Sequence, residues 1–308
     1  MEIARIDSTE YKKNFPAPYH IFNSVDFSEL NRDKCQDLHY LDFKDKKKRF
    51  GIILGEKEQE LRSPFSAPFG GFSFTRNERI EYIEQAISLL KGYGESIGKK
   101  ILISLPPSIY EPSFISKTVS AFLRMGAAIK YVDLNFQFET DRFAQYNAFI
   151  NRSARKNLHN SLKHDFQFLQ LDSKKDEDVS RAYSVIKSNR ESKGFPLRMP
   201  LQAVLDTVKV IPADFFVLSY NNMDVAAAQV FHVAPKIAQV IYWGDVIEYS
   251  DLRVMNYFTY KVFEYYYKHD ITILDIGPST EFGIPNYGLC EFKENIGCTV
   301  SLKYTWQL

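Results

Sequence analysis

The clearest pattern of apolar and polar positions lies in the last third of the chain. Val225–Val233 carries almost no charge, which predicts a strand inside a sheet, and Ile237–Trp243 follows as the second strand of a hairpin. Leu252–His269 has apolar residues at steps of three and four, which predicts a helix that packs one face on that sheet. Ile271–Asp275 is a further short apolar run. We therefore expect a hairpin, a crossover helix and another strand.

Capping signals set the expected helix limits. Ser250-Asp251 supplies an N-cap oxygen and a first-turn carboxylate before the Leu252–His269 helix. Thr75-x-x-Glu78 has the residue types of a capping box and predicts the start of another helix. Gly92 and Gly94 predict its end.

The remaining periodicity predicts alternating helices and strands. Asn221-Asn-Met-Asp224 has the residue types of a hairpin turn. Helices are expected over Ile21–Leu30, Pro112–Met125, Asn151–Leu158, Glu177–Asn189, Leu201–Val210 and Tyr287–Ile296. Strands are expected over Leu38–Phe43, Phe50–Leu54, Ile101–Leu105, Ala128–Phe136, Phe166–Leu171, Phe215–Tyr220 and Thr299–Tyr304.

The two halves of the chain share this order of elements, with an offset of about 175 residues, which indicates a duplicated module. The repeat depends on element order, because residue identity between the halves is weak. The character of the sequence changes from about Phe138 to Lys163. We therefore predict two domains, 1–150 and 151–308.

Composition narrows the class of protein. The 308 residues are 45% hydrophobic, 15% aromatic and 25% charged, which is typical of well-packed globular domains. The net charge of +1 argues against a DNA-binding or membrane-surface protein. No run approaches the length of a membrane span, and the N-terminus lacks the features of a signal peptide. The three cysteines, widely spaced and without C-x-x-C, fit a reduced protein, so a cytoplasmic location is expected.

The sequence lacks the motifs of several common classes of enzyme and metal site. The six histidines are scattered, without H-E-x-x-H or a His/Asp cluster, so no metal site is expected. His232 lies in an apolar strand and is expected to be a satisfied core residue. No G-x-S-x-G or P-loop pattern is present, which argues against a hydrolase or a nucleoside-triphosphatase.

The second half has the order β-α-α-β-β-β-α-β-α-β, which resembles the acyl-CoA N-acyltransferase (GNAT) fold. A duplicated version resembles the FemAB family, which adds amino acids to cell-wall precursors. The resemblance is carried by Ile273-Leu-Asp-Ile-Gly277, Asn286-Tyr-Gly-Leu289 and the pair Phe292-Lys293. It implies an α/β fold with a mixed sheet, built from two tandem GNAT-like domains. The first would be degenerate and shape the acceptor groove, and the second would be catalytic.

One departure concerns the donor. Acyl-CoA enzymes of this fold bind pyrophosphate with a glycine-rich turn before the central helix, where backbone N–H groups face the anion. The matching stretch here, Tyr242–Ser250, has one glycine and two acidic residues. FemAB-type proteins use aminoacyl-tRNA and do not need that turn. We therefore expect no tightly bound cofactor and an acyl donor that is either aminoacyl-tRNA or acyl-CoA.

The resemblance places Lys293 and Phe292 in the donor site, where the ammonium would stabilise charge on the acyl transition state. The alternative for Lys293 is an ordinary exposed helical lysine. Asp275 ends the central strand at the edge where open α/β sheets place their ligands, and could take a proton from an attacking amine. Equally, it could hold N–H groups of the loop that follows.

Further residues are candidates for substrate binding. Ser279 and Asn286 lie in or beside the Gly/Pro loop, and Tyr242 and Trp243 stand between strand and helix; packing and loop hydrogen bonds are the alternatives. In the first half, Gly70 and Gly71 could present N–H groups to a phosphate-bearing acceptor, helped by Arg62. All three lie in a loop whose phenylalanines are expected to fill space between domains.

The resemblance implies an acyltransferase that forms an amide on an amine acceptor, such as a cell-envelope precursor. Charged tRNA would be a partner if it is the donor. An acetyl-CoA-dependent N-acetyltransferase and a non-catalytic binding protein of the same fold are the alternatives.

Overall fold

The computed structural model describes residues 1–308, and the chain forms two compact units. Unit 1 comprises Met1–Leu134, Thr280–Ile284 and Ser301–Leu308, and unit 2 comprises Asn135–Ser279 and Pro285–Val300. These units differ from the predicted division at residue 150, because two short segments of the second half complete unit 1 and residues 135–150 belong to unit 2.

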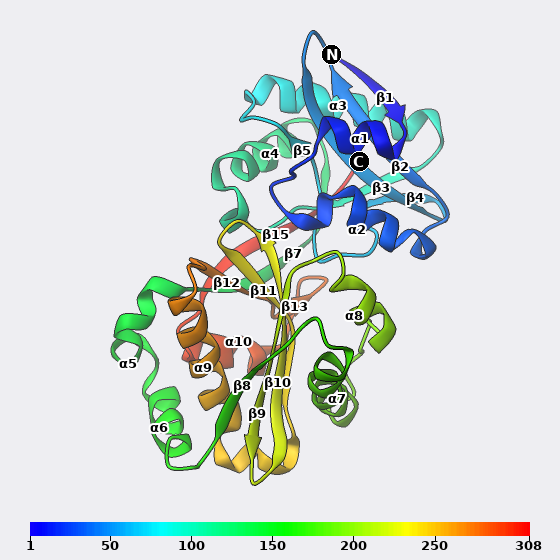
Figure 1. Cartoon of the computed structure of the whole chain (residues 1–308). Coiled ribbons are helices and arrows are strands. Elements are labelled where there is room, and N and C mark those ends of the chain that lie inside the picture. The colour runs from blue at the N-terminus through cyan, green and yellow to red at the C-terminus, as the bar shows by residue number, and fades with distance from the viewer. The chain divides into compact units, whose positions relative to one another are not determined.

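Unit 1 is a mixed sheet flanked by helices (Figure 1). Its strands follow the order β1-β2-β3-β4-β6, with β15 beside β6. Neighbours are antiparallel except β4 and β6, which pair in parallel from Glu60↔Lys100 to Ser63↔Ile103. Its elements are β1 (Glu2–Ile6), α1 (Ser8–Asn14), η1 (Ile21–Asn23), α2 (Val25–Leu30), η2 (Arg32–Lys34), β2 (Leu38–Lys44), β3 (Lys48–Lys57), β4 (Glu60–Ser63), β5 (Ser73–Phe74), α3 (Ile80–Ser96), β6 (Lys100–Ser104), η3 (Ser108–Tyr110), α4 (Pro112–Arg124) and the first part of β7 (Ala128–Glu139).

Aromatic side chains pack among aliphatic ones in the core of unit 1. Phe72, expected to fill space between domains, is buried inside this unit against Phe43 and Phe50. Phe122 of α4 stacks on Trp306 of β15, with ring centroids 5.3 Å apart. A residue from the far end of the sequence therefore completes this core.

Unit 2 has the strand order β7-β12-β11-β10-β9-β8, and β11 pairs in parallel with β12. Its elements are the last part of β7, η4 (Thr140–Gln145), α5 (Tyr146–Phe149), α6 (Arg152–Ser161), β8 (Gln167–Leu171), α7 (Asp176–Ser192), α8 (Leu201–Thr207), β9 (Ala213–Tyr220), β10 (Met223–Ala234), β11 (Ile237–Asp245), η5 (Ile247–Leu252), α9 (Val254–Lys268), β12 (Ile273–Pro278), α10 (Tyr287–Asn295) and the first part of β15 (Thr299–Gln307). A short β13 (Thr280–Glu281), which belongs to unit 1, pairs with β14 (Ile284–Pro285).

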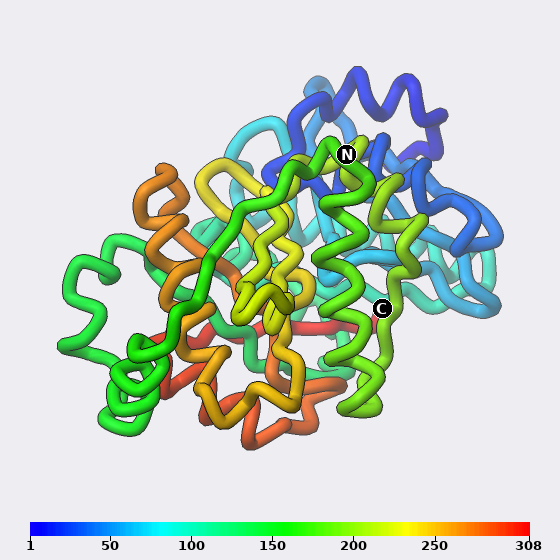
Figure 2. Tube along the Cα trace, turned by 60° about the horizontal axis from the view of Figure 1, so that its bottom comes forward, coloured from blue at the N-terminus to red at the C-terminus, as the bar shows by residue number.

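Helices cover both faces of this sheet. Figure 1 shows α7 and α9 on opposite sides of β9 and β10, and Figure 2 shows α8 beside α7. The apolar stripe of α9, with Phe258, Val262 and Tyr266 fully buried, packs on one face as its periodicity predicted. β10 lies between β9 and β11, so the prediction of an interior strand is confirmed.

The predicted turn between β9 and β10 is confirmed. Asn221 and Asn222 have φ values of 49° and 63°, as a two-residue hairpin turn with the twist of its strands requires. Asparagine tolerates this left-handed backbone better than most residues.

Two helix starts differ from the prediction. The N-cap of α3 is Arg79, and the Glu78 carboxylate is instead paired with Arg49 at 2.8 Å and Arg76 at 2.9 Å. Ser250-Asp251 lies inside η5, and α9 begins after Arg253, whose backbone is left-handed. Helix α3 also continues through Gly92 and Gly94 to Ser96, so the predicted stop is wrong.

The predicted repeat is confirmed in element order. Leaving out the shortest pieces, the chain reads β-α-α-β-β-β-α-β-α-β from β1 to β7, and again from β8 to β15. The tenth strand of each repeat pairs in the other unit: β7 pairs with β12 through residues 135–139, and β15 pairs with β6 through residues 305–307. None of the helices is both long and apolar enough to cross a bilayer.

Candidate functional site

The site is built around the C-terminal end of β12 in unit 2. Asp275 is fully buried there, and its carboxylate accepts three hydrogen bonds of 2.8 Å, from Asn135 Nδ2, Gln239 Nε2 and the backbone N–H of Gly277. Three donors thus satisfy the hydrogen-bonding needs of this buried side chain. The bond to Gly277 is the kind that was expected of a loop-capping aspartate.

Lys293 of α10 lies over the same end of β12. It is 2% exposed, so the alternative of an exposed helical lysine is wrong. Its Nζ donates to the carbonyls of Ile276 and Gly277 at 2.9 Å and of Pro278 at 3.2 Å. A buried ammonium held by three carbonyls keeps its charge at a defined point beside the strand end.

Burial lowers the pKa of Lys293 to about 8, an effect that the thiol of Cys298 and the carboxylate of Asp275 oppose and that Arg190 adds to. Asp275 and Arg190 thus both act electrostatically on Lys293 within unit 2. A positive charge with a lowered pKa beside a fixed carboxylate is a common feature of catalytic sites.

Two glutamines extend the polar group across the sheet. Gln239 of β11 is directly opposite Asp275, and Phe231 of β10 is opposite Gln239. Gln229 lies two residues from Phe231 on the same strand, and thus on the same face. Both amide atoms of Gln229 and the Oε1 of Gln239 are buried without a partner. An unpaired buried amide atom costs about 1–3 kcal/mol, so these atoms are strong candidates to contact a ligand.

Arg190 of α7 faces the same side of the sheet. Its guanidinium lies 5.0 Å from the ring centroid of Tyr242, which is opposite Gln229 in β11. Burial lowers the pKa of Arg190, and its Nε is buried without a partner. A guanidinium held on an aromatic face with a donor unused is suited to an anionic group.

The other predicted residues of the second half lie in different surroundings. Ser279 follows β12 directly, and its buried hydroxyl has no partner in the chain. Asn286 is the N-cap of α10 and accepts from the N–H of Leu289, as the loop alternative predicted. Phe292 is half-buried beside Lys293. Trp243 is opposite Ala228, so it points to the face opposite that of Tyr242.

The predicted residues of the first half lie in unit 1. The N–H of Gly70 donates to Ser104 O at 2.9 Å, and that of Gly71 to Ser63 Oγ at 3.0 Å. Both glycines are buried, so neither N–H is exposed for a phosphate in this conformation. Arg62 is exposed and paired with Glu60.

The sequence reasoning missed Asn135, Arg190, Gln229 and Gln239. For the two glutamines a signal was present, because each is a polar residue inside an otherwise apolar strand. His232, by contrast, is satisfied as expected: its Nε2 lies 2.7 Å from Asp214 Oδ2, although the side chain is partly exposed.

No protein-family model and no curated protein matches this sequence. Solved structures do match its fold. FemX is similar over 100% of this chain and 97% of its own, with a TM-score of 0.70 and 13% identity. A tandem GNAT protein from the clavulanic acid biosynthesis pathway is similar over 100% of this chain and 98% of its own, with a TM-score of 0.56 and 9% identity. The C-terminal domain of a putative lysylphosphatidylglycerol synthetase from Agrobacterium fabrum is similar over 98% of this chain and 92% of its own, with a TM-score of 0.63 and 9% identity.

These similarities confirm the predicted class of fold. The chain has a tandem GNAT fold of the kind seen in FemX. At such identities the similarity concerns the fold, and the chemistry must be argued from the site.

Proposed function

We propose that this chain is an acyltransferase that moves an acyl or aminoacyl group onto an amine acceptor, with its chemistry in unit 2. The observation that carries the proposal is the buried Lys293 ammonium, held by three carbonyls beside Asp275 at the end of β12. The fold shared with FemX and a tandem GNAT protein supports the same class.

The reaction needs stabilisation of one developing charge. The amine nitrogen forms a bond to the acyl carbon, and the carbonyl π pair moves onto oxygen. Collapse of this oxyanion expels the ribose oxygen of tRNA or the sulfur of coenzyme A, and the leaving group takes up the proton that the amine loses. A fixed positive charge and a hydrogen-bond donor lower the energy of such an oxyanion.

Lys293 and Ser279 divide these two tasks. The three N–H groups of Lys293 are bonded to carbonyls, so the ammonium acts through its charge and by fixing the end of β12. The unpartnered hydroxyl of Ser279 follows directly and serves as the donor to the oxyanion. Asp275 holds Gly277 and Gln239 in place and is a positioning residue in this proposal.

An aminoacyl donor fits better than acyl-CoA. Helix α9 begins after Arg253, which provides no side-chain cap, and no glycine stands at this junction; η5 precedes the helix with exposed Glu248. This entry lacks the glycine-rich turn that would bring N–H groups to a pyrophosphate. Acceptors related to cell-envelope precursors remain part of the proposal, as does charged tRNA as a partner.

A transfer assay tests the proposal. The purified chain is given radiolabelled aminoacyl-tRNAs or acetyl-CoA together with a panel of amine acceptors, and amide product is measured. Ser279→Ala is expected to lower kcat about 100-fold with little change in KM, because it removes a donor used in the transition state. Ser184→Ala, on the exposed side of α7, is the matched control.

Three results would contradict parts of this proposal. Formation of product with acetyl-CoA as the donor, but not with aminoacyl-tRNA, would favour the N-acetyltransferase alternative. Binding of a donor without product would favour the non-catalytic protein. Equal kcat in Ser279→Ala and in the control would remove Ser279 from the mechanism.

A further inference from the structure

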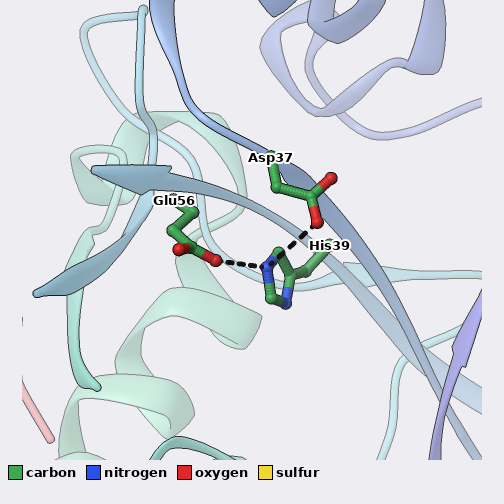
Figure 3. A group of neighbouring side chains, drawn as sticks. All are labelled: Asp37, His39 and Glu56. Carbon is green, nitrogen blue, oxygen red and sulfur yellow. Dashed lines mark hydrogen bonds and ion pairs between the residues drawn. The ribbon is translucent and has the colours of Figure 1, made fainter. Parts of the chain in front are cut away.

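A second group of chemically active side chains lies in unit 1, far along the sequence from the residues above. Asp37 directly precedes β2, His39 lies at the start of β2 and Glu56 near the end of β3, and Figure 3 shows the three converging. His39 Nε2 lies 3.1 Å from Glu56 Oε2 and 3.9 Å from Asp37 Oδ2. One ligand atom from each residue lies within 4.8 Å of the others.

These distances suit a small dication. With bonds of about 2.0–2.1 Å, two ligands of a tetrahedral Zn²⁺ lie about 3.3–3.4 Å apart. The two separations measured from His39 Nε2, 3.1 Å to Glu56 and 3.9 Å to Asp37, fall on either side of that value. One imidazole with two carboxylates is also a donor set that zinc accepts.

The ligands are already oriented by their neighbours. His39 is 3% exposed, and its Nδ1 lies 2.7 Å from Tyr93 Oη on α3. With Nδ1–H donating to Tyr93, the Nε2 lone pair faces both carboxylates. Asp37 Oδ1 accepts from the N–H of Leu38 at 2.8 Å, which leaves Oδ2 for an ion. Such outer contacts fix the tautomer and orientation of metal ligands.

Cations lie beside both carboxylates, and Arg5 holds the Asp37 oxygen that the ion would need; Arg32 Nη2 also lies 3.9 Å from Asp37 Oδ1. Arg5 donates to Asp37 Oδ2 at 2.6 Å, and Lys99 Nζ lies 2.8 Å from Glu56 Oε1. The Arg5 side chain is 44% exposed, so it can turn out to solvent. Lys99 contacts the carboxylate oxygen that the ion does not need.

We propose that Asp37, His39 and Glu56 form a zinc site on unit 1, completed by water and in competition with Arg5. The site ties β2 to β3 at their shared end and is independent of acyl transfer. Because Arg5 is the direct competitor at Asp37 Oδ2, its removal strengthens the site.

Metal binding by the whole chain tests this proposal. Protein freed of metal by a chelator is titrated with Zn²⁺ by calorimetry, and stoichiometry is measured by equilibrium dialysis. One ion per chain is expected, with affinity at least tenfold lower in His39→Gln and in Glu56→Gln. Arg5→Gln is expected to bind several-fold more tightly. Cys35→Ser, close in sequence but outside the site, should bind as the wild type does.

Circular dichroism shows whether each variant is folded. If His39→Gln does not fold, Glu56→Gln tests the loss of a ligand in its place. Absence of saturable binding in both the wild type and Arg5→Gln would overturn the proposal and leave a network of ion pairs. The proposal would also be overturned if Glu56→Gln bound Zn²⁺ as tightly as the wild type does, or if the wild type bound Mg²⁺ as tightly as Zn²⁺.

Discussion

Replacing Lys293 by methionine tests whether the ammonium holds the end of β12. The variant keeps the length of the side chain but leaves the carbonyls of Ile276, Gly277 and Pro278 without their donor. Each buried acceptor left unpaired costs about 1–3 kcal/mol. The substitution also removes the cost of burying a charge. The lowering of the Lys293 pKa from 10.5 to about 8 corresponds to about 3 kcal/mol of that cost. Taking about 2 kcal/mol for each of the three acceptors, against about 3 kcal/mol of relief, we expect a net loss of about 3 kcal/mol in the free energy of unfolding at pH 7.

The pH dependence gives an independent check on Lys293. Because its pKa is lowered in the folded chain, the unfolded chain binds more protons between about pH 8 and 10.5. The contribution of this group to stability therefore rises with pH across that window. Lys293→Met should lack this rise, so the stability difference between wild type and variant should grow from pH 8 to 10.

Urea unfolding followed by circular dichroism measures both quantities. Lys268→Met, an exposed side chain at the C-terminal end of α9, is the matched control and should change stability by less than about 0.5 kcal/mol. If Lys293→Met is as stable as this control, and the two share one pH profile, the ammonium does not hold the strand end and the argument fails.

Further predictions concern packing and titration. Gly244→Ala should destabilise unit 2 by about 2–4 kcal/mol in urea unfolding, because a Cβ there would overlap the buried Asn189 amide. Gly92→Ala, in the open on α3, should instead stabilise by about 0.5–1 kcal/mol, and equal effects of the two would contradict this view. Burial lowers the pKa of His20 to about 3, so the unfolded chain binds the extra proton and stability should fall from about pH 6.5 toward 3. His20→Phe should flatten that profile between pH 4 and 7; an unchanged slope would mean that His20 is not responsible.

Periodicity and turn chemistry were enough for most of the fold. The β10 hairpin, α9 and the Asn221-Asn222 turn followed from residues a few positions apart, and so did the element order that the repeat depends on. Strands β1 and β4 were missed, since both are short and carry charged residues that hide their pairing. The predicted capping box at Glu78 failed because Arg49, 29 residues away, pairs with that carboxylate.

The site was less predictable, for a related reason. Lys293 and Asp275 were proposed from a resemblance, and their roles are still proposals. Asn135 reaches Asp275 across 140 residues of sequence, and Gln239 meets it through strand register. Likewise, Asp37, His39 and Glu56 do not form a recognisable motif in the sequence, and only the pairing of β2 with β3 brings them together.

The exchange of β7 and β15 between the units affects the order in which the protein can fold during synthesis. Unit 1 needs Trp306 for its core and residues 305–307 to cover β6, so its folding cannot finish until nearly all of residues 1–308 have left the ribosome. Unit 2 takes its tenth strand from residues 135–139, which are made earlier, although it also includes Pro285–Val300. A fragment that ends at residue 150 would expose the face of Phe122 that Trp306 covers, and we expect it to aggregate when expressed alone.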